Sequence, residues 1–346
     1  MGNLSGMNFL QKIKSTLGRR FLEYMGKFRF SDVTWCFNLT RGILRHYKFW
    51  EFSSKNTNRV VVYMTDKTVI SGLADRIKSM VFGYALALEN GREFCLYHDK
   101  GFRLEEYLEP NEVDWRCEPA DISWGLNKVA FLFYSREWPE LKYRKKEYHV
   151  YQSEDIIADF MPEHLRAKYT YHDLFWRLFK LSPRLETLLE QTMQENALRE
   201  NEYVAVHTRF INFFEHFENI EGVGKVASTE EEKMRMIQRV HATVEQIRIQ
   251  SGADSVLLFS DSNYFLNVQH PEYVRILPGS IGHIAHQSGN TSVADKTFVD
   301  LLTISRAKEV YSLIGDGLYE SGFSKMGAAI GGKKFVRVKV KECVYE

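Results

Sequence analysis

The sequence predicts an α/β protein with parallel β-sheets in two domains, and three observations support this. Short apolar runs of strand length alternate with longer segments of helical period, which is the pattern of a doubly wound sheet. The chain has 346 residues, more than a single core usually organises. Its residues are 44% hydrophobic and 14% aromatic, which is enough for two sizeable cores.

The first half of the chain contains one clear strand–helix–strand unit. Residues 59–64 form an apolar strand, and residues 73–90 carry apolar side chains at helical spacing. Gly91 stands where a glycine commonly ends a helix, and residues 93–97 are predicted to form the next strand. Together these segments predict a βαβ unit.

A domain boundary is expected where a long helical stretch gives way to polar sequence. Residues 171–198 are predicted to be helical, and residues 194–202 are polar. We therefore expect an N-terminal domain of residues 1–198 and a C-terminal domain of residues 199–346.

The second half alternates strands and helices most clearly. Ser228 and Glu231 form a capping-box pattern that opens its longest helix. A short helix is expected to start at Ser262, next to the strand that ends at Phe259. The expected strands are 203–207, 255–259, 273–277, 309–314 and 334–340, and the expected longer helices are 230–250, 293–307 and 322–330.

Composition excludes several classes of protein. The formal net charge is +1, so the chain lacks the global basic field that is typical of nucleic-acid-binding proteins. No apolar run approaches the ~20 residues of a membrane span, and residues 1–30 lack the apolar core of a signal peptide. The cysteines are far apart without a CxxC pair, so we expect thiols of a reducing compartment, neither disulfides nor zinc ligands. They are Cys36, Cys95, Cys117 and Cys343.

The N-terminal segment 9–29 is basic and carries apolar side chains at helical spacing. Two interpretations of this pattern stay open. The segment is either a helix packed on its own domain or a peripheral contact with an anionic membrane surface.

Polar residues follow four successive strands of the C-terminal domain. Because the carboxyl ends of parallel strands share one edge of a sheet, these residues predict a ligand crevice there. They are His207 with Arg209, Ser260 to Ser262, Pro278 to Ser280, and Gly315 to Gly317 followed by Ser321 to Ser324.

The residues at this edge suggest a nucleoside diphosphate. Ser321, Gly322, Phe323 and Ser324 open a helix whose free backbone N–H groups favour phosphate. Together with the planar guanidinium of Arg209, they would hold a diphosphate. The carboxylate of Asp261 can accept two hydrogen bonds from a purine edge such as that of guanine. Taken singly, the serine-rich turn and Asp261 are also consistent with ordinary helix caps.

Other chemistries find no support in the sequence. The P-loop, dinucleotide-binding, zinc-protease and serine-hydrolase motifs are absent. No Asp-x-Asp sequence occurs, so a metal-bound diphosphate is not expected. His283 and His286 share a loop, but no third zinc ligand accompanies them.

The motifs and their order resemble the superfamily of GDP-fucose-dependent fucosyltransferases with the GT-B fold. This group contains the bacterial nodulation fucosyltransferase, the core α1,6-fucosyltransferases and the protein O-fucosyltransferases. The matching blocks are Ser71 to Lys78 with Gly91-Arg92, Val206 to Arg209 (the His-x-Arg motif), and Phe259 to Ser262 followed by Asp300 to Leu302 and Ser321 to Ser324.

The resemblance implies two Rossmann-like domains with a cleft between them, the first on the acceptor side and the second binding the donor. Arg209 would neutralise the β-phosphate as the fucose–oxygen bond breaks. Ser324 and the backbone around Phe323 would hold the same diphosphate, while His207 and Asp261 would contact guanine. Catalysis would be inverting and would need neither a metal nor a cofactor.

The chain departs from the family pattern at Asn212, where the His-x-Arg-x-x-Asp motif carries an acid. The general base for the acceptor hydroxyl is therefore open. Glu215 and Glu218 lie in the same loop and are the candidates, although both are also consistent with solvated surface charges.

The sequence therefore predicts a glycosyltransferase that moves fucose from GDP-fucose to a glycan or a lipid-linked saccharide. The alternatives are a GT-B enzyme that uses another nucleotide sugar, or a relative that binds nucleotide or glycan without turnover. The setting we expect is cytoplasmic, in a bacterial pathway of polysaccharide biosynthesis, where the basic segment 9–29 could hold the protein near the membrane.

Overall fold

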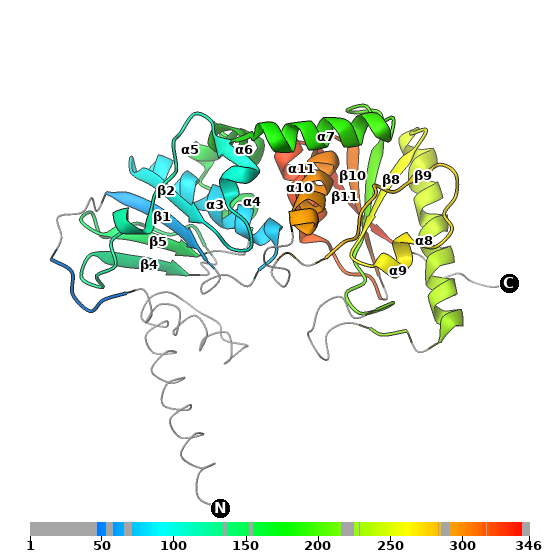
Figure 1. Cartoon of the computed structure of the whole chain (residues 1–346), viewed down its shortest axis with the longest axis horizontal. Coiled ribbons are helices and arrows are strands. Elements are labelled where there is room, and N and C mark those ends of the chain that lie inside the picture. The colour runs from blue at the N-terminus through cyan, green and yellow to red at the C-terminus, as the bar shows by residue number, and fades with distance from the viewer. Residues whose placement is uncertain are drawn as a thin grey trace, which may run out of the picture. The chain divides into compact units, whose positions relative to one another are not determined.

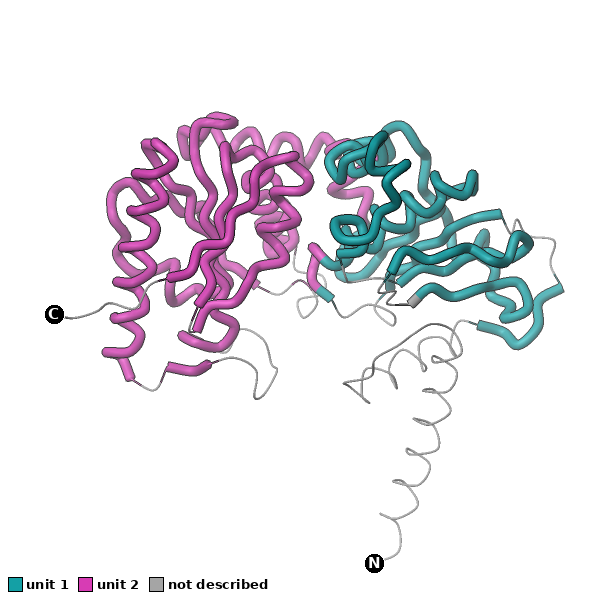
Figure 2. The backbone as a smooth tube through the Cα atoms, turned by 180° about the vertical axis from the view of Figure 1, so that it is seen from behind, with its two compact units in different colours: residues 1–71, 75–103, 110–179 teal, residues 72–74, 104–109, 180–346 magenta. Residues whose placement is uncertain are grey.

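The computed structural model describes most of the chain, which folds as two compact units (Figure 2). Unit 1 comprises residues up to 71, 75–103 and 110–179, and unit 2 comprises residues 72–74, 104–109 and 180–346. The described residues are 47–52, 58–65, 71–133, 137–151, 155–215, 225–227, 229–282, 284, 291–315 and 317–340.

Unit 1 is built on a four-stranded parallel sheet, as the sequence predicts. Its strand order is β2-β1-β5-β4. The strands are β1 (Arg59–Met64), β2 (Glu93–His98), β4 (Val129–Phe133) and β5 (Glu147–Tyr151). Helix α3 (Leu73–Glu89) joins β1 to β2, and Gly91 follows it with φ 58°, so the expected βαβ unit is confirmed.

Helix α3 packs directly on the sheet because Gly83 leaves room for two strand side chains. A Cβ at Gly83 would lie 2.8 Å from Cγ2 of Val62 and 3.1 Å from the Phe94 ring.

The shorter elements are the 3₁₀ turns η1 (Leu104–Glu106) and η2 (Pro119–Asp121), helices α4 (Ile156–Phe160), α5 (Glu163–Arg166) and α6 (Tyr171–Leu178), and strands β3 (Leu108–Pro110) and β6 (Phe179–Leu181). The strands β3 and β6 pair with each other.

The expected helix over residues 171–198 is wrong, because the chain breaks it into three elements. After α6, residues 179–181 form β6, and α7 (Pro183–Glu195) then starts a new helix. Ser182 caps α7 by accepting the N–H of Leu185 at 3.2 Å. Ser182 also precedes Pro183, and helical backbone angles are sterically disfavoured for a residue before proline.

The main crossover between the units lies at residues 179–180, whereas the sequence placed the boundary at 198–199. Helix α7 accounts for the difference. It packs against helix α10 (Thr291–Ser305) of unit 2 and buries Leu185, Leu189 and Met193. The helix that the sequence assigned to the first domain is therefore part of the second.

Residues 104–109 also belong to unit 2, although they interrupt the sequence of unit 1. Tyr107 is fully buried there. Its hydroxyl donates to Oδ1 of Asp295 at 2.7 Å, and its ring stacks on Phe298 with the centroids 4.3 Å apart. An early segment of the chain thus completes the core of the later unit.

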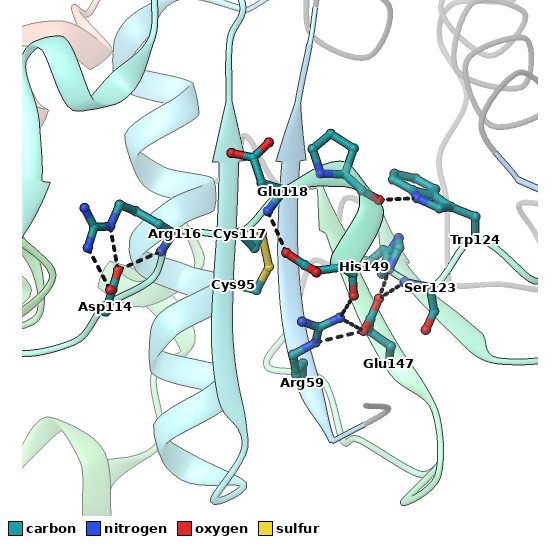
Figure 3. The surroundings of a disulfide bond; sticks show 12 residues. Arg59, Cys95, Asp114, Arg116, Cys117, Glu118, Ser123, Trp124, Glu147 and His149 are labelled. Atoms are coloured by element: carbon teal, nitrogen blue, oxygen red, sulfur yellow. Dashed lines mark hydrogen bonds and ion pairs between the residues drawn. A yellow bond between two sulfur atoms is a disulfide. The ribbon is translucent and has the colours of Figure 1, made fainter. Parts of the chain in front are cut away.

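Cys95 and Cys117 form a disulfide, which corrects the expectation of reduced thiols (Figure 3). Their Cα atoms are 5.9 Å apart, and the bridge fixes the segment after Cys117 to strand β2. A disulfide that closes a loop of this size stabilises the folded protein by about 3 kcal/mol. Spacing alone could not reveal the pair, since four cysteines allow three pairings. Cys36 and Cys343 lie outside the described residues.

A buried carboxylate at Glu147 organises the same side of unit 1 (Figure 3). Glu147 accepts from Nη2 of Arg59 at 2.7 Å and from the N–H of Ser123 at 2.8 Å. It is also 2.8 Å from Nε2 of His149, whose Nδ1 pairs with the Tyr47 hydroxyl. The buried charge is tolerated because it is paired and fully hydrogen-bonded.

Unit 2 is built on a five-stranded parallel sheet in the order β11-β10-β7-β8-β9 (Figure 1). Helix α8 covers one face, while α10 and α11 cover the other. The strands are β7 (Val204–Thr208), β8 (Val256–Ser260), β9 (Val274–Arg275), β10 (Glu309–Ile314) and β11 (Lys334–Lys339), and the remaining helices are α8 (Glu230–Ser251), α9 (Asn263–Leu266) and α11 (Gly322–Gly331). The predicted α/β class with parallel sheets is confirmed.

Helix α8 begins one residue later than its predicted capping box. Thr229 caps it by accepting the N–H of Glu232 at 3.1 Å, while Ser228 lies outside the described residues. The helix ends at Gly252, which adopts φ 63°.

None of the helices in the described part of the chain combines the length and the hydropathy that a membrane span needs.

Candidate functional site

The carboxyl edge of the unit 2 sheet brings His207 to the start of helix α11. His207 lies near the end of β7, in register with Phe259 of β8 and Ser312 of β10. Its ring is 6.0 Å from the ring of Phe323, centroid to centroid. The expected meeting of the His-x-Arg strand with the Ser-Gly-Phe-Ser turn is therefore present.

The imidazole of His207 is neutral at physiological pH. Burial, and to a smaller extent the positive charge of Arg209, lower its pKa to about 3. Its Nδ1 is buried and has no hydrogen-bond partner among the described residues. A buried polar atom without a partner is rare, so it marks a position where a ligand would supply the missing hydrogen bond.

The two serines at the start of α11 satisfy each other. The Ser321 hydroxyl caps the helix by accepting the Ser324 N–H at 3.3 Å, and the Ser324 hydroxyl donates to the Ser321 carbonyl at 3.2 Å. The N–H of Ser321 in turn donates to Oγ of Ser312 at 3.2 Å. An anion at this helix end would therefore meet the backbone N–H groups of Gly322 and Phe323 rather than the serine hydroxyls.

Arg209 lies beside the segment that leads into α11. Its carbonyl accepts the N–H of Tyr319 at 2.8 Å, and its side chain is half-buried. The guanidinium lowers the pKa of both His207 and Asp261, which places its charge near both groups. The cation and the helix N-terminus thus converge on one region of the sheet edge.

Asp261 connects the ends of β8 and β7. Its carboxylate accepts the N–H of Phe210 at 2.7 Å and the N–H of Ile211 at 2.9 Å. Burial raises the pKa of Asp261 above its ordinary value, because its effect exceeds the opposing effects of these bonds and of Arg209. Ile211 adopts φ 60°, a left-handed conformation that is rare for a β-branched residue. Asp261 therefore holds a strained turn directly after Arg209, and its contact with guanine remains a prediction.

Glu215 is engaged in a structural contact. Its Oε1 accepts from the Ser262 hydroxyl and from the N–H of Tyr264, each at 3.0 Å. The Ser262 hydroxyl also caps α9 by accepting the N–H of Phe265 at 3.1 Å. The other candidate base, Glu218, lies outside the described residues, as do Asp316, His283 and His286.

Two contributors to this edge were not singled out from the sequence. Ser312 is one, and its position on β10 opposite His207 was the only signal. The other is Lys296, whose Nζ lies 2.5 and 2.7 Å from the carboxylate oxygens of Asp300, a residue of the matching blocks. The Lys296 chain packs over Gly279, which adopts φ 100°, so the pair fixes the loop after β9. Its signal was the i, i+4 spacing on a predicted helix.

Sequence comparisons find no relatives, whereas structural comparison finds several. No protein-family model matches the chain, and no curated protein matches it. A mutant of Arabidopsis thaliana FUT1 in complex with GDP superposes with a TM-score of 0.52 at 11% identity, over 88% of this chain and 75% of that one.

The chain has the fold of FUT1. Two further similar structures are the fucosyltransferase NodZ from Bradyrhizobium (TM-score 0.45, 13% identity, 80% of this chain and 92% of that one) and POFUT1 in complex with GDP (TM-score 0.42, 12% identity, 83% and 99%). The match to FUT1 confirms the resemblance drawn from the motifs at the level of the fold. At these identities the likeness concerns the fold, and the activity is inferred below.

Proposed function

We propose that the protein is a glycosyltransferase that transfers fucose from GDP-fucose to a glycan acceptor. The observation that carries the proposal is the convergence of His207, Arg209 and the N-terminus of α11 at one edge of the unit 2 sheet. This is where a doubly wound sheet binds its ligand, and FUT1, with the same fold, was solved with GDP.

The chemistry follows from the charges at this edge. Cleavage of the bond between fucose and the β-phosphate leaves negative charge on the diphosphate. The Arg209 guanidinium and the backbone N–H groups of Gly322 and Phe323 are preorganised donors for that charge. With a cation already in place, the reaction needs no metal, and attack by the acceptor hydroxyl would invert the anomeric centre.

The general base must take the proton of the acceptor hydroxyl. Because Glu215 is hydrogen-bonded to Ser262 and Tyr264, its carboxylate serves the fold around α9. We therefore retain Glu218 as the candidate base for the acceptor hydroxyl.

A second candidate function is nucleotide binding without turnover. The observation that favours it is Asn212, which is buried and stands where the family motif carries an acid. An amide cannot accept a proton from an acceptor hydroxyl, so catalysis would then rest on another group.

The disulfide bears on where the protein works. Disulfides persist in oxidising compartments and are rare in the cytoplasm. The Cys95–Cys117 bridge therefore favours an oxidising compartment over the cytoplasmic setting expected from the sequence. Non-reducing peptide mapping of protein from its natural source would show whether the bridge forms there.

Calorimetric titration with GDP, GDP-fucose, UDP and ADP in the absence of metal tests the donor class. We expect selective binding of the two guanine compounds. Arg209→Ala should weaken it roughly ten- to hundredfold through loss of a charge-assisted bond, while Arg199→Ala on the surface of unit 2 should leave it unchanged. Preference for UDP or ADP would overturn the fucose assignment. Incubation with GDP-fucose distinguishes the two candidate functions, because only an enzyme would release fucose to water or transfer it to acceptor glycans.

A further inference from the structure

Exposed aromatic side chains gather at one edge of unit 1. Among the described residues, the large apolar side chains that are most open to solvent include Phe49 at 84%, Trp50 at 56%, Phe52 at 90% and Tyr143 at 55%. Exposed apolar groups that occur singly are ordinary, but a group of aromatic rings marks an interaction surface.

The segment 47–52 is fixed to the body of unit 1, so its exposed rings are not the result of a loose chain. The N–H of Lys48 donates to the Trp124 carbonyl at 2.6 Å, and the N–H of Leu126 donates to the Lys48 carbonyl at 2.9 Å. The Glu51 carboxylate accepts the N–H groups of Trp124 and Gly125, each at 3.0 Å. These bonds hold the backbone while the neighbouring aromatic side chains face solvent.

A basic loop, residues 142–146, is fixed in a similar way. Arg92 donates to the carbonyl of Lys146 and to that of Tyr143, each at 2.9 Å. The N–H of Tyr143 donates to the Tyr148 hydroxyl at 2.6 Å, and the Arg92 guanidinium lies 5.0 Å from the Tyr148 ring. The loop therefore presents its cations from a defined backbone.

The two segments share the edge at which β4 and β5 begin. Lys128 lies between them, since its N–H donates to the Gly125 carbonyl and its carbonyl accepts the N–H of Glu147 at 3.0 Å. Lys146 also reaches the carbonyl of Val129 with its Nζ, at 3.3 Å. We call this surface, formed by residues 47–52, Lys128 and residues 142–146, the basic aromatic edge.

The basic side chains of this edge outnumber its acids. Among the residues that the structure describes, none of the basic side chains of this edge is paired with a carboxylate. The edge's own acid, Glu51, is engaged with the N–H groups of Trp124 and Gly125. Because the whole chain carries a net charge of only +1, the positive charge is local. The cations are Lys48, Lys128, Lys142, Arg144 and Lys145.

We propose that the basic aromatic edge binds the surface of an anionic lipid membrane. Lys and Arg next to exposed Trp and Phe are the composition of peripheral membrane surfaces: the cations meet anionic headgroups, and the rings enter the interface. A single-stranded nucleic acid would instead require a positively charged groove with stacking platforms along it, and a neutral glycan would not require the cations. The inference does not rest on the proposed transferase activity.

Co-sedimentation of the full-length protein with vesicles tests the proposal. We expect binding to phosphatidylcholine vesicles that contain phosphatidylserine, weaker binding at high salt, and little binding to pure phosphatidylcholine. Equal binding to both vesicles, or binding to neither, would overturn the proposal. Preference for single-stranded nucleic acid or for glycans over the anionic vesicles would do the same.

Two sets of substitutions locate the surface. Lys142→Ser, Arg144→Ser and Lys145→Ser together should lower the association constant by about a hundredfold, because each cation near an anionic surface contributes roughly fivefold. Phe49→Ala, Trp50→Ala and Phe52→Ala together should also weaken binding at least tenfold, and in a manner less sensitive to salt.

Matched controls separate the edge from global charge and hydrophobicity. Lys180→Ser, Arg199→Ser and Lys334→Ser remove the same charge from unit 2, and Phe160→Ala removes an exposed ring elsewhere in unit 1; both should bind as the wild type does. Circular dichroism confirms the fold of every variant. If binding survives both edge variants and is lost on replacing Lys12, Lys14, Arg19 and Arg20, the basic segment 9–29 is responsible and the proposal fails.

Discussion

At the scale of single residues, one carboxylate sets the direction of the chain at the candidate site. Asp261, at the end of β8, holds two consecutive N–H groups that follow β7. The second belongs to Ile211, whose positive φ is costly for its side chain. The turn persists because the carboxylate satisfies both donors, and the residue just before the turn is Arg209.

Replacing Asp261 should affect stability and nucleotide binding together. Asp261→Ala leaves two buried N–H groups without partners and should lower the free energy of unfolding by about 2–4 kcal/mol. Asp261→Asn keeps one acceptor and should cost less. Urea unfolding measures the first effect, and GDP titration of the folded variants measures the second. Unchanged GDP affinity in the Asn variant would show that the turn does not position Arg209.

The buried imidazole of His207 makes stability depend on pH. Its pKa is about 3 in the folded protein and near 6.5 when unfolded. Between these values the unfolded chain binds more protons, so stability is complete above about pH 6.5 and falls as the pH drops toward 3. The contribution is about 1.4 kcal/mol per pH unit in that window.

Comparison of the wild type with His207→Gln isolates this contribution from those of the other histidines. We expect the wild type to lose stability more steeply between pH 6.5 and pH 5 than the variant, as measured by urea unfolding at each pH. Parallel curves for the two proteins would mean that His207 has the same pKa in the folded protein as in the unfolded chain.

At the scale of elements, close packing of α10 against α11 fixes the helix end that faces the sheet edge. A Cβ at Gly327 would lie 2.5 Å from Cγ2 of Ile304 and 2.9 Å from its Cβ. Gly327 is therefore required for the approach of the two helices, even though alanine is the better helix former.

Gly327→Ala should destabilise the protein by about 1–3 kcal/mol through overpacking. It should also weaken GDP binding, because α11 and its N-terminus would shift. Ile304→Ala in the same chain removes Cγ2, the atom in closest contact, and keeps Cβ, so the double variant should recover part of the loss introduced by Gly327→Ala. Purely additive effects in thermal unfolding would contradict this packing relation.

The disulfide makes a second prediction at this scale. Replacing Cys95 and Cys117 with serine should lower the free energy of unfolding by about 3 kcal/mol. The wild type in reductant should approach the same value, and the double variant should not respond to reductant. A wild-type unfolding midpoint that ignores reductant would show that the bridge does not form in solution.

At the scale of the whole molecule, the sequence predicts the features that follow from the order of the strands, but not those that depend on contacts between side chains far apart in the chain. His207 and Ser321 to Ser324 could be placed together because His207 lies near the end of β7 and the serines follow β10, which is its neighbour in one parallel sheet. The capping role of Glu215 could not be foreseen, because its partners lie 47 and 49 residues away. The pairing of Cys95 with Cys117 and the break at Ser182 also depend on tertiary contacts that spacing does not encode.

The placement of Tyr107 has a consequence for the synthesis of the protein. Its partners Asp295 and Phe298 are added to the chain almost two hundred residues later. At ribosomal rates of about 5–20 residues per second, that interval is on the order of ten to forty seconds. During this time the ring has no native core to enter, although the strands of the first unit are already complete. In the nascent chain, residues 104–109 should therefore stay exposed, and chaperones should be able to bind them, until translation is nearly finished.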